Sequence, residues 1–325
     1  MGNIFSDCTE SKVVSLEADL VVPSKNTLGE CPLWCERRQR LMWVDIDGKM
    51  FWSLDPETKD VKSIELPERP GSFCLTKDDR LIFAFEKGPA FYDPEVGPGS
   101  LERIATFDES PGVTRMNDGR VDPQGRFVVG GYVEQGTEPV SAIYRLSPGA
   151  SELELLIPRI ACTNSICFRV SPEGGTRMVF CDSKWLPREI KVVNEYDKIP
   201  GSAVNEKAET LIKWQPGEEE GGKLPDGSIV DSEGNIWCAH FGRGKMVRYN
   251  KEGRIDCEVS VPVPHVTCAA LGGKDYRTMF ITNASRKKLS EEERKKLPDE
   301  DFAGGLFAVK LPEELCAGMP ECRFG

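Results

Sequence analysis

Short apolar segments, each entered through a turn, recur along the whole chain. They read as strands rather than helices, because they are short and Gly, Pro, Asp and Asn cluster beside them. Two of the preceding turns are Asp122–Gly125 and Asp231–Gly234. The six copies of the segment are Leu41–Asp45, Leu81–Phe85, Phe127–Gly131, Met178–Asp182, Ile236–His240 and Met279–Asn283. The pattern predicts six structural units of one kind.

A further strand follows the repeated segment in most units and ends in another turn. Met50–Leu54, Ala142–Leu146 and Met246–Tyr249 are examples. Successive copies start roughly 40 to 58 residues apart, which suits blades of four short antiparallel strands. Helical periodicity is scarce, with its clearest case at Leu289–Lys296, and this disfavours a parallel sheet with crossover helices. The predicted fold class is all-β, a six-bladed β-propeller.

The first strand of the chain suggests how such a ring closes. Val13–Val22 belongs to no unit, and we expect it to complete the last blade, because a closed ring leaves only short protected edges. The longest interval between units contains Lys184–Lys223, which is expected to form a surface loop. Of the 325 residues, 1–12 are expected to form a flexible N-terminal segment and 13–325 a single propeller domain.

The charge balance limits the partners that the protein can bind. Lys and Arg total 42 against 53 Asp and Glu, a net charge of -11, with the acidic residues scattered along the chain. Nucleic acid is not expected as a partner, because binding to phosphates needs clustered cations. The expected partner is a small molecule, and the chain is expected to be a monomer or a weak oligomer.

The cysteines and the N-terminus bear on localisation. Several of the 12 cysteines lie inside apolar strands, where thiols act as small hydrophobes. A secretory leader and an apolar run of membrane length are not visible, so a reduced cytoplasmic protein is expected. Met1–Ser6 fits the pattern for N-myristoylation at Gly2, with Cys8 as a second acylation site. An unmodified terminus is favoured, because Asp7 lies nearby and one acyl chain without a basic run anchors weakly.

Polar residues recur where the innermost strand of each blade would begin. Inner strands run along the central tunnel, so these positions from all blades meet at one mouth. They hold Glu30, Gly71–Ser72, Asn117, Asn164, Asp226 and His265–Cys268. Carboxylates of Glu30 and Asp226 would neutralise a hard divalent cation, and Asn carbonyls would add ligands without further repulsion. Each residue alone is an ordinary turn residue, but four at equivalent positions predict an axial metal site.

A second polar set ends the repeated segments, which return to the same face. It comprises Asp45, Asp182, His240 and Asn283, and these residues are expected to orient the ligands. His240 is one of only two histidines, and two interpretations remain open for it. It is either a structural imidazole with satisfied hydrogen bonds or a substrate contact.

At these residues the sequence resembles the SMP-30/gluconolactonase/luciferin-regenerating enzyme family, which includes regucalcin. The resemblance covers about residue 16 to about residue 312. It is carried by Leu28–Trp34, Arg115–Arg126, Thr163–Ser165, Leu224–Gly227 and Trp237–Gly242. The resemblance implies a six-bladed propeller and metal-dependent hydrolysis of sugar lactones.

The resemblance also implies roles for single residues. Glu30, Asn164 and Asp226 would bind one divalent metal ion. Asn117 would be a further ligand or a substrate contact through water. Arg115 would hold substrate oxygens, and Asp226 would be the general base. The identity of the ion stays open among calcium, zinc, manganese, magnesium and iron.

Three departures from the family pattern concern substrate and redox chemistry. Cys31 stands beside the expected metal ligand, where its thiol would confer redox sensitivity. Val133–Gly136 differs from the substrate loop of animal members, and Glu134 within it is expected to contact the substrate. Lys184–Pro187 suggests a lid of different shape.

The working hypothesis is water attack on a lactone carbonyl polarised by the metal, with Asp226 as base. A serine hydrolase is disfavoured, because the chain lacks a G-x-S-x-G turn and has only two histidines. Two alternatives remain. One is hydrolysis of organophosphates, phosphotriesters or aryl esters on the same fold, and the other is a non-enzymatic calcium-binding regulatory protein. Arg115 beside Asn117 favours catalysis, because a calcium buffer needs no substrate clamp.

Overall fold

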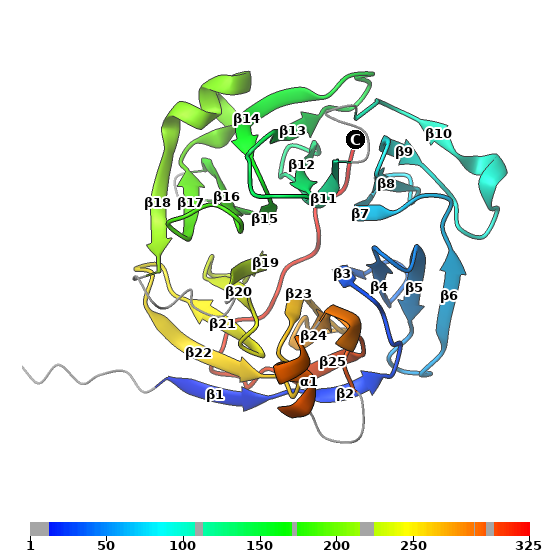
Figure 1. The fold of residues 1–325 in the computed structure, drawn as a ribbon, viewed down its shortest axis with the longest axis vertical. Coiled ribbons are helices and arrows are strands. Elements are labelled where there is room, and N and C mark those ends of the chain that lie inside the picture. Colours follow the sequence, from blue (N-terminus) through cyan, green and yellow to red (C-terminus); the bar gives the residue numbers. More distant parts are fainter. Residues whose placement is uncertain (1–12, 108–112, 171–173, 215–223, 289, 297–301) are drawn as a thin grey trace, which may run out of the picture.

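Six β-sheets stand around a central axis like the blades of a propeller (Figure 1). The computed structural model describes residues 13–107, 113–170, 174–214, 224–288, 290–296 and 302–325. In each blade the first strand lies nearest the axis and later strands follow outwards. The six-bladed all-β architecture predicted from the repeated segments is confirmed.

Five blades have four strands and blade five has a fifth, and each repeated segment of the sequence is the second strand of its blade. Blade one consists of β3 (Gly29–Cys35), β4 (Arg40–Asp45), β5 (Met50–Leu54) and β6 (Val61–Glu65). Blade two consists of β7 (Pro70–Leu75), β8 (Leu81–Phe85), β9 (Gly88–Phe91) and β10 (Glu102–Arg103). Blade three consists of β11 (Thr114–Val121), β12 (Phe127–Val133), β13 (Ser141–Leu146) and β14 (Glu154–Ile160).

The remaining blades follow the same plan. Blade four consists of β15 (Thr163–Val170), β16 (Thr176–Asp182), β17 (Glu189–Val193) and β18 (Ala208–Lys213). Blade five consists of β19 (Leu224–Val230), β20 (Ile236–Phe241), β21 (Lys245–Tyr249) and β22 (Ile255–Ser260). Blade six consists of β23 (Val266–Gly272), β24 (Thr278–Asn283), β25 (Leu306–Lys310) and β2 (Asp19–Val22).

The hydrophobic core lies between neighbouring blades. Side chains alternate along a strand, so each blade sends apolar groups towards both of its neighbours. In β8 every residue is buried. Its Phe83 stacks on Phe73 of the same blade and meets Phe51 of blade one edge-on, with ring centroids 5.6 Å apart. Because both faces of a second strand are covered, these strands read as continuous apolar runs, which made the repeat visible in the sequence.

Two short strands near the start of the chain close the ring. β2 pairs antiparallel with β25 and completes the last blade, so the prediction for Val13–Val22 holds for Asp19–Val22 only. The preceding strand β1 (Val14–Glu17) pairs in parallel with β22 and adds a fifth strand to blade five. The start of the chain therefore ties two neighbouring blades together, which opposes opening of the ring at its seam.

The interval from Lys184 to Lys223 is not one loop, and this prediction was wrong for its described part. That part contains β17, β18 and two 3-10 helices, Tyr196–Lys198 and Gly201–Lys207. Outer strands of a blade are partly exposed, so their apolar alternation is weak and the sequence signal was missed. Residues 215–223 lie outside the described residues.

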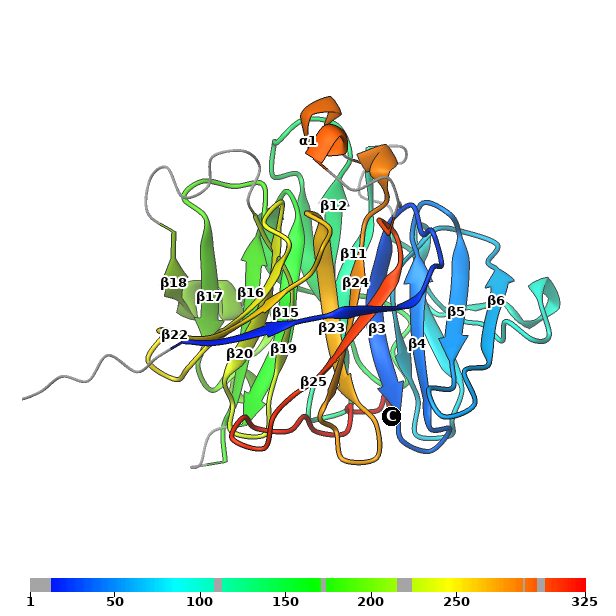
Figure 2. The same cartoon turned by 90° about the horizontal axis from the view of Figure 1, so that it is seen from below.

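Helices are few and short in the described chain. α1 (Glu291–Lys296) lies within the predicted helical segment and projects from one face of the ring (Figure 2). The other short helices are of the 3-10 type, at Pro98–Ser100 and Arg286–Lys288. None of the helices in the described ranges is long and apolar enough to cross a membrane. The proposed acylation sites at Gly2 and Cys8 lie outside the described residues.

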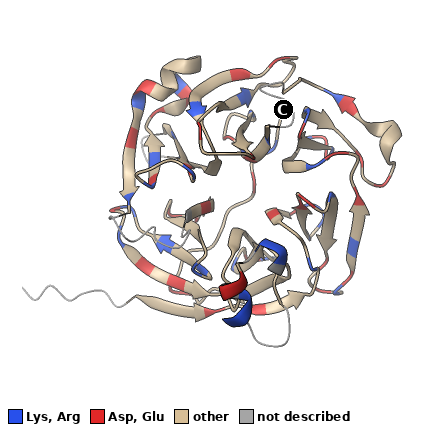
Figure 3. Ribbon diagram, in the orientation of Figure 1, with Lys and Arg blue, Asp and Glu red and all other residues tan. Residues whose placement is uncertain are grey.

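Charged residues are distributed over the whole ring. Lys and Arg are interspersed with Asp and Glu around the outer strands (Figure 3). This distribution agrees with the scattered charges seen in the sequence.

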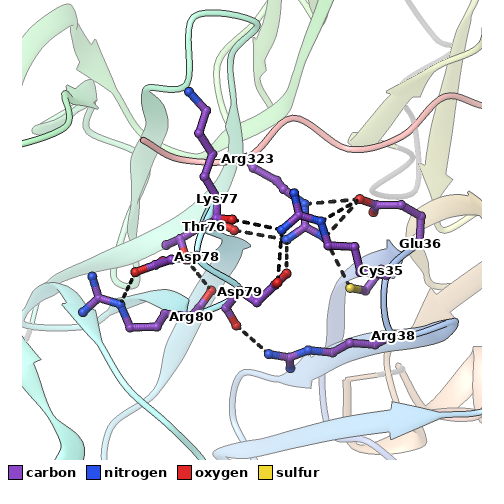
Figure 4. Close-up of polar contacts among 10 residues, drawn as sticks. Cys35, Glu36, Arg38, Thr76, Lys77, Asp78, Asp79, Arg80 and Arg323 are labelled. Atoms are coloured by element: carbon purple, nitrogen blue, oxygen red, sulfur yellow. Dashed lines mark hydrogen bonds and ion pairs between the residues drawn. The ribbon is translucent and has the colours of Figure 1, made fainter.

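The C-terminal segment after β25 runs across the face opposite α1 and passes the centre of the ring (Figures 1 and 2). Arg323 anchors it by donating hydrogen bonds to Glu36 Oε1 at 3.1 Å and Asp79 Oδ1 at 2.7 Å (Figure 4). The Phe324 amide donates to the Leu75 carbonyl at 2.9 Å. The segment thus fastens blades one and two to each other on this face.

Arg323 is expected to matter more for stability than its neighbour Arg37, although both bind Asp79. The Arg323 side chain is 7% exposed and that of Arg37 is 47% exposed. Arg323→Ala should lower the free energy of unfolding by about 3 kcal/mol, because it leaves the buried Thr76 carbonyl and Cys35 thiol without their donor and removes the ion pairs with Glu36 and Asp79. Arg37→Ala should lower it by about 0.5 kcal/mol or less. Urea unfolding of both variants checks this, and equal losses would contradict the anchoring role.

Candidate active site

The candidate ligands lie in the first half of four inner strands. Glu30 lies on β3, Asn117 on β11, Asn164 on β15 and Asp226 on β19. Each strand shifts its register with its second strand at or next to that residue. Such a β-bulge bends the strand and turns side chains out of the regular alternation. The bulges therefore release these polar side chains from the packing between blades.

The two carboxamides touch each other across neighbouring blades. Asn117 Nδ2 donates to Asn164 Oδ1 at 3.2 Å, and Asn164 Nδ2 donates to Ser183 Oγ at 2.9 Å. Arg115 Nη1 donates to Asn117 Oδ1 at 2.7 Å. These bonds orient both amides, and each carbonyl oxygen keeps a second lone pair for another partner.

The carboxylates at the axis interact electrostatically. Burial, with repulsion from Asp118, raises the pKa of Glu30 to about 8. Burial, with repulsion from Glu30 and then Asp118, raises the pKa of Asp226 well above its ordinary value. Arg115 attracts both groups without offsetting these effects. The site therefore gathers more negative charge than its own cations balance.

This donor set fits a divalent cation. Carboxylate and amide oxygens are hard ligands, and an added positive charge is what the crowded carboxylates lack. Across the described part of the chain, no three His, Cys, Asp or Glu side chains form a metal site by themselves. A cation at this position would therefore also need the amide oxygens of Asn117 and Asn164 beside Glu30 and Asp226.

Asp118 is an axial carboxylate that the sequence reasoning missed. It follows Asn117 within the bulge of β11, and its Oδ2 accepts a hydrogen bond from the Ile166 amide at 2.8 Å. Burial is the main cause of its raised pKa. In a regular strand, consecutive side chains point to opposite faces. Under that assumption only one of Asn117 and Asp118 could face the axis, and Asn117 was chosen. The adjacent pair of polar residues was the available signal.

Basic side chains and one aromatic ring form the rim of the site on blade three. The Arg115 guanidinium lies 4.5 Å from the centre of the Tyr132 ring, and Lys184 Nζ lies 4.2 Å from it. Glu134 receives two hydrogen bonds from Arg69, at 2.6 and 2.9 Å, and its Oε1 is 3.9 Å from Arg115 Nε. Glu134 thus lies near Arg115, and Lys184 is a rim cation that the sequence reasoning assigned only to a lid.

One donor at this rim is left over. Within the described ranges, Arg115 Nε is buried and has no hydrogen-bond partner. Leaving a buried N–H without a partner costs stability, so such a group often marks a binding position. Arg115 therefore has a donor available for an oxygen of a bound molecule.

The polar residues at the ends of the second strands hold the loops that lead into the inner strands. Asp45 accepts hydrogen bonds from the Thr27 and Leu28 amides at 2.8 and 2.9 Å. Asp182 accepts from the Ala161 and Cys162 amides at 2.7 and 3.0 Å. They orient the candidate ligands through the backbone rather than by touching their side chains.

Asn283 also holds a loop in blade six, but this loop leads into the third strand of the blade. Its Oδ1 accepts a hydrogen bond from the Gly304 amide at 2.6 Å, and its Nδ2 donates to the Gly305 carbonyl. These contacts tie β24 to the loop that leads into β25.

His240 lies in the packing between blades four and five. Its Nε2 is 2.9 Å from the Tyr249 hydroxyl, and its ring packs beside Trp214 at a centroid distance of 5.6 Å. No contact in the described chain joins it to the four candidate ligands. The contacts favour the structural interpretation, and the substrate contact remains a prediction.

His240 also makes stability depend on pH. Burial, with repulsion from Arg243 and Lys245, lowers the pKa of His240 to about 3 from 6.5. The unfolded chain therefore takes up the proton first, and stability falls as the pH drops below about 6.5. We expect this effect of His240 to lower the free energy of unfolding by about 2 kcal/mol between pH 7 and pH 5.

Denaturant unfolding at several pH values measures this effect. His240→Gln keeps a hydrogen-bonding side chain but does not titrate, so its stability should fall less steeply than that of the wild type. Parallel pH profiles for the two proteins would rule out the assignment.

The Cys31 thiol is less reactive than the sequence suggested. Its Sγ packs against blade two, 3.5 Å from the Phe73 amide. Burial is the main reason that the pKa of Cys31 is raised to about 12. Because the thiolate is the reactive form, the structure disfavours redox sensitivity at this position.

Comparison with known proteins places this site in a wider group. Residues 28–285 match the model of the protein family described as SMP-30/gluconolactonase/LRE-like region. An L-arabinolactonase of Azospirillum brasilense is 37% identical over 313 residues, covering 95% of each chain. A 6-deoxy-6-sulfogluconolactonase of Pseudomonas putida is 29% identical over 297 residues, covering 91% of this chain and 96% of the relative.

A solved structure has the same fold. The calcium-binding protein regucalcin of Agrobacterium tumefaciens superposes with a TM-score of 0.82 at 24% identity, covering 97% of this chain and 99% of that one. The match to the family spans all six inner strands completely, from β3 to β23. The chain therefore belongs to the SMP-30/gluconolactonase/LRE-like family.

Proposed function

We propose that this protein is a metal-dependent hydrolase that opens sugar lactones. The observation that carries the proposal is the axial set of Glu30, Asn117, Asn164 and Asp226, with the unused Arg115 donor beside it. Two relatives are sugar lactonases, and one of them is 37% identical to this chain. A cation site next to a donor for substrate oxygens supports attack of water on a polarised ester carbonyl.

The four axial residues would hold the divalent cation. When bound, the cation supplies Lewis acidity to a carbonyl oxygen and keeps the neighbouring carboxylates ionised. The donor set is compatible with calcium, zinc, manganese, magnesium or iron. Calcium has additional support, because a structural relative is a calcium-binding protein.

Protein side chains would transfer the proton and orient the substrate. Asp226 takes a proton from the attacking water, and its short side chain leaves the proton acceptor fixed on a rigid strand. Arg115 and Asn117 orient hydroxyl and carbonyl oxygens of the substrate. Glu134 keeps Arg69 and Arg115 in place and accepts a hydrogen bond from a sugar hydroxyl. Correct orientation supplies much of the rate, because an ionised carboxylate is a weak base.

A substrate panel with controlled metal content tests the proposal. The protein is stripped with a chelator, reloaded with one metal at a time, and assayed with a pentonolactone, a hexonolactone, dihydrocoumarin and a fluorophosphate. Metal-dependent opening of the aldonolactones, faster than that of the other two substrates, is the expected result.

The other outcomes point to the alternatives. Faster turnover of the fluorophosphate or of dihydrocoumarin would favour a phosphotriesterase or an aryl esterase. Tight calcium binding without turnover of any substrate would favour a regulatory calcium-binding protein. Full activity in the stripped protein would overturn metal dependence.

A further inference from the structure

Two arginines face each other at the end of blade four that is remote from the candidate active site. Arg169 on β15 and Arg177 on β16 are direct partners in the antiparallel pair. Direct partners lie on the same face of a sheet with Cβ atoms about 5 Å apart, and like charges there repel. The arrangement costs stability unless something between the guanidiniums offsets the charge.

The described residues do not supply that offset. Arg169 is only 6% exposed. Among the contacts of the described residues, neither guanidinium has a hydrogen bond or an ion pair. The nearest attracting carboxylate is Asp231, which already accepts two hydrogen bonds from Arg248, at 2.9 and 2.8 Å. Because an arginine stays charged when buried, Arg169 is a buried cation that has no counter-ion among the described residues.

Both arginines line a cavity of about 550 Å³. Its walls come from the inner strands of blades three, four and five and from residues 318–322 of the C-terminal segment. Arg120 and Lys251 add two further cations to the lining. The size suits a small metabolite or a hydrated ion.

Two of the acidic groups that line the cavity already have partners. Glu321 pairs with Arg120, and Asp231 pairs with Arg248. Glu233 is exposed, and among the described residues it forms no ion pair with a cation of the lining. Within the described ranges, the lining cations that have no ion pair are Arg169, Arg177 and Lys251.

We propose that this cavity binds a small oxyanion, a phosphate, sulfate or carboxylate group, held between Arg169 and Arg177. The planar guanidinium offers paired donors that match two oxygens of such a group. The bound group would compensate the repulsion between the two arginines. This oxyanion site is separate from the axial site, because Asn164 begins β15 and Arg169 lies near its other end, about 15 Å away. The C-terminal segment that walls it crosses the face opposite α1 (Figure 2).

Isothermal titration calorimetry on the full-length protein tests the proposal with inorganic phosphate, sulfate and acetate as separate probes. Saturable binding of at least one probe to the wild type is expected. Arg169→Gln and Arg177→Gln should each weaken it by about ten-fold or more, and the double variant should abolish it. The affinity of Arg169→Lys should lie between those of the wild type and Arg169→Gln, because lysine keeps the positive charge but lacks the paired donors of the guanidinium. Arg80→Gln, which changes an exposed arginine paired with Asp78, should bind like the wild type.

Thermal unfolding separates a binding role from a structural one. In buffer without oxyanions, Arg169→Gln should unfold at the same temperature as the wild type or higher, because the variant removes repulsion. Added phosphate should raise the unfolding temperature of the wild type and leave that of the variant unchanged. Absence of saturable binding for all three probes, equal binding by the variants, or a marked loss of stability of Arg169→Gln without oxyanions would each overturn the proposal.

Discussion

Replacement of Asp226 by asparagine is expected to lower kcat/KM for lactone opening by about three orders of magnitude. A positioned general base contributes about 10² to 10⁴ in rate, and asparagine cannot accept the proton. The substitution keeps the shape of the side chain, and the Asp226 carbonyl keeps its hydrogen bond from Ser165 Oγ at 2.5 Å. Steady-state kinetics at increasing metal concentration measure the effect.

The metal titration distinguishes the two roles proposed for Asp226. A loss that disappears at high metal concentration would assign Asp226 to metal binding alone. A loss that persists at saturation supports its role as base. Asp47→Asn serves as the control, because Asp47 pairs with Lys288 outside the axial set, and its activity should stay within about three-fold of the wild type.

Glu30→Gln is expected to lower the affinity for the divalent metal by at least about a hundred-fold. Removal of groups that only support metal ligands costs about 10- to 100-fold, and Glu30 would be a charged ligand itself. In the metal-free protein the same substitution should raise stability. There the variant should be more stable than the wild type, because a buried carboxyl repelled by Asp118 and Asp226 is replaced by a neutral amide.

Calorimetric metal titration and unfolding in chelator measure the two effects. Glu68→Gln is a matched control, because Glu68 binds Arg103 on the outer part of blade two. It should leave metal affinity unchanged. Unchanged metal affinity in Glu30→Gln, or a loss of stability in chelator, would remove Glu30 from the proposed ligand set.

The residue pattern pointed to four polar side chains on the inner strands because the blade repeats itself. Once the second strands were recognised, counting back along the chain reached Glu30, Asn117, Asn164 and Asp226. The same counting missed Asp118, because it assumed strict alternation where the strand has a bulge. Bulges depend on pairing with a neighbouring strand, and a single strand carries little local signal for them.

Contacts remote in sequence were also beyond prediction. Arg120 and Glu321 are remote in sequence but form an ion pair, and Arg323 joins Glu36 to Asp79. Each partner alone looks like an ordinary surface charge. Arg169 has no ion pair among the described residues, and this was hidden for the same reason, because a missing partner is recognised only from neighbours that are remote in sequence.

The amino-acid sequence by itself determined the architecture, since short apolar strands at a blade-like spacing can bury their side chains only against copies of themselves. It also determined which oxygen-bearing residues start the inner strands. Only the tertiary structure decided the details of the charges: the three crowded carboxylates, the free Arg115 donor, the partner of His240 and the facing Arg169 and Arg177. Secondary structure follows periodicities within one segment, whereas burial and charge compensation depend on segments brought together from every blade.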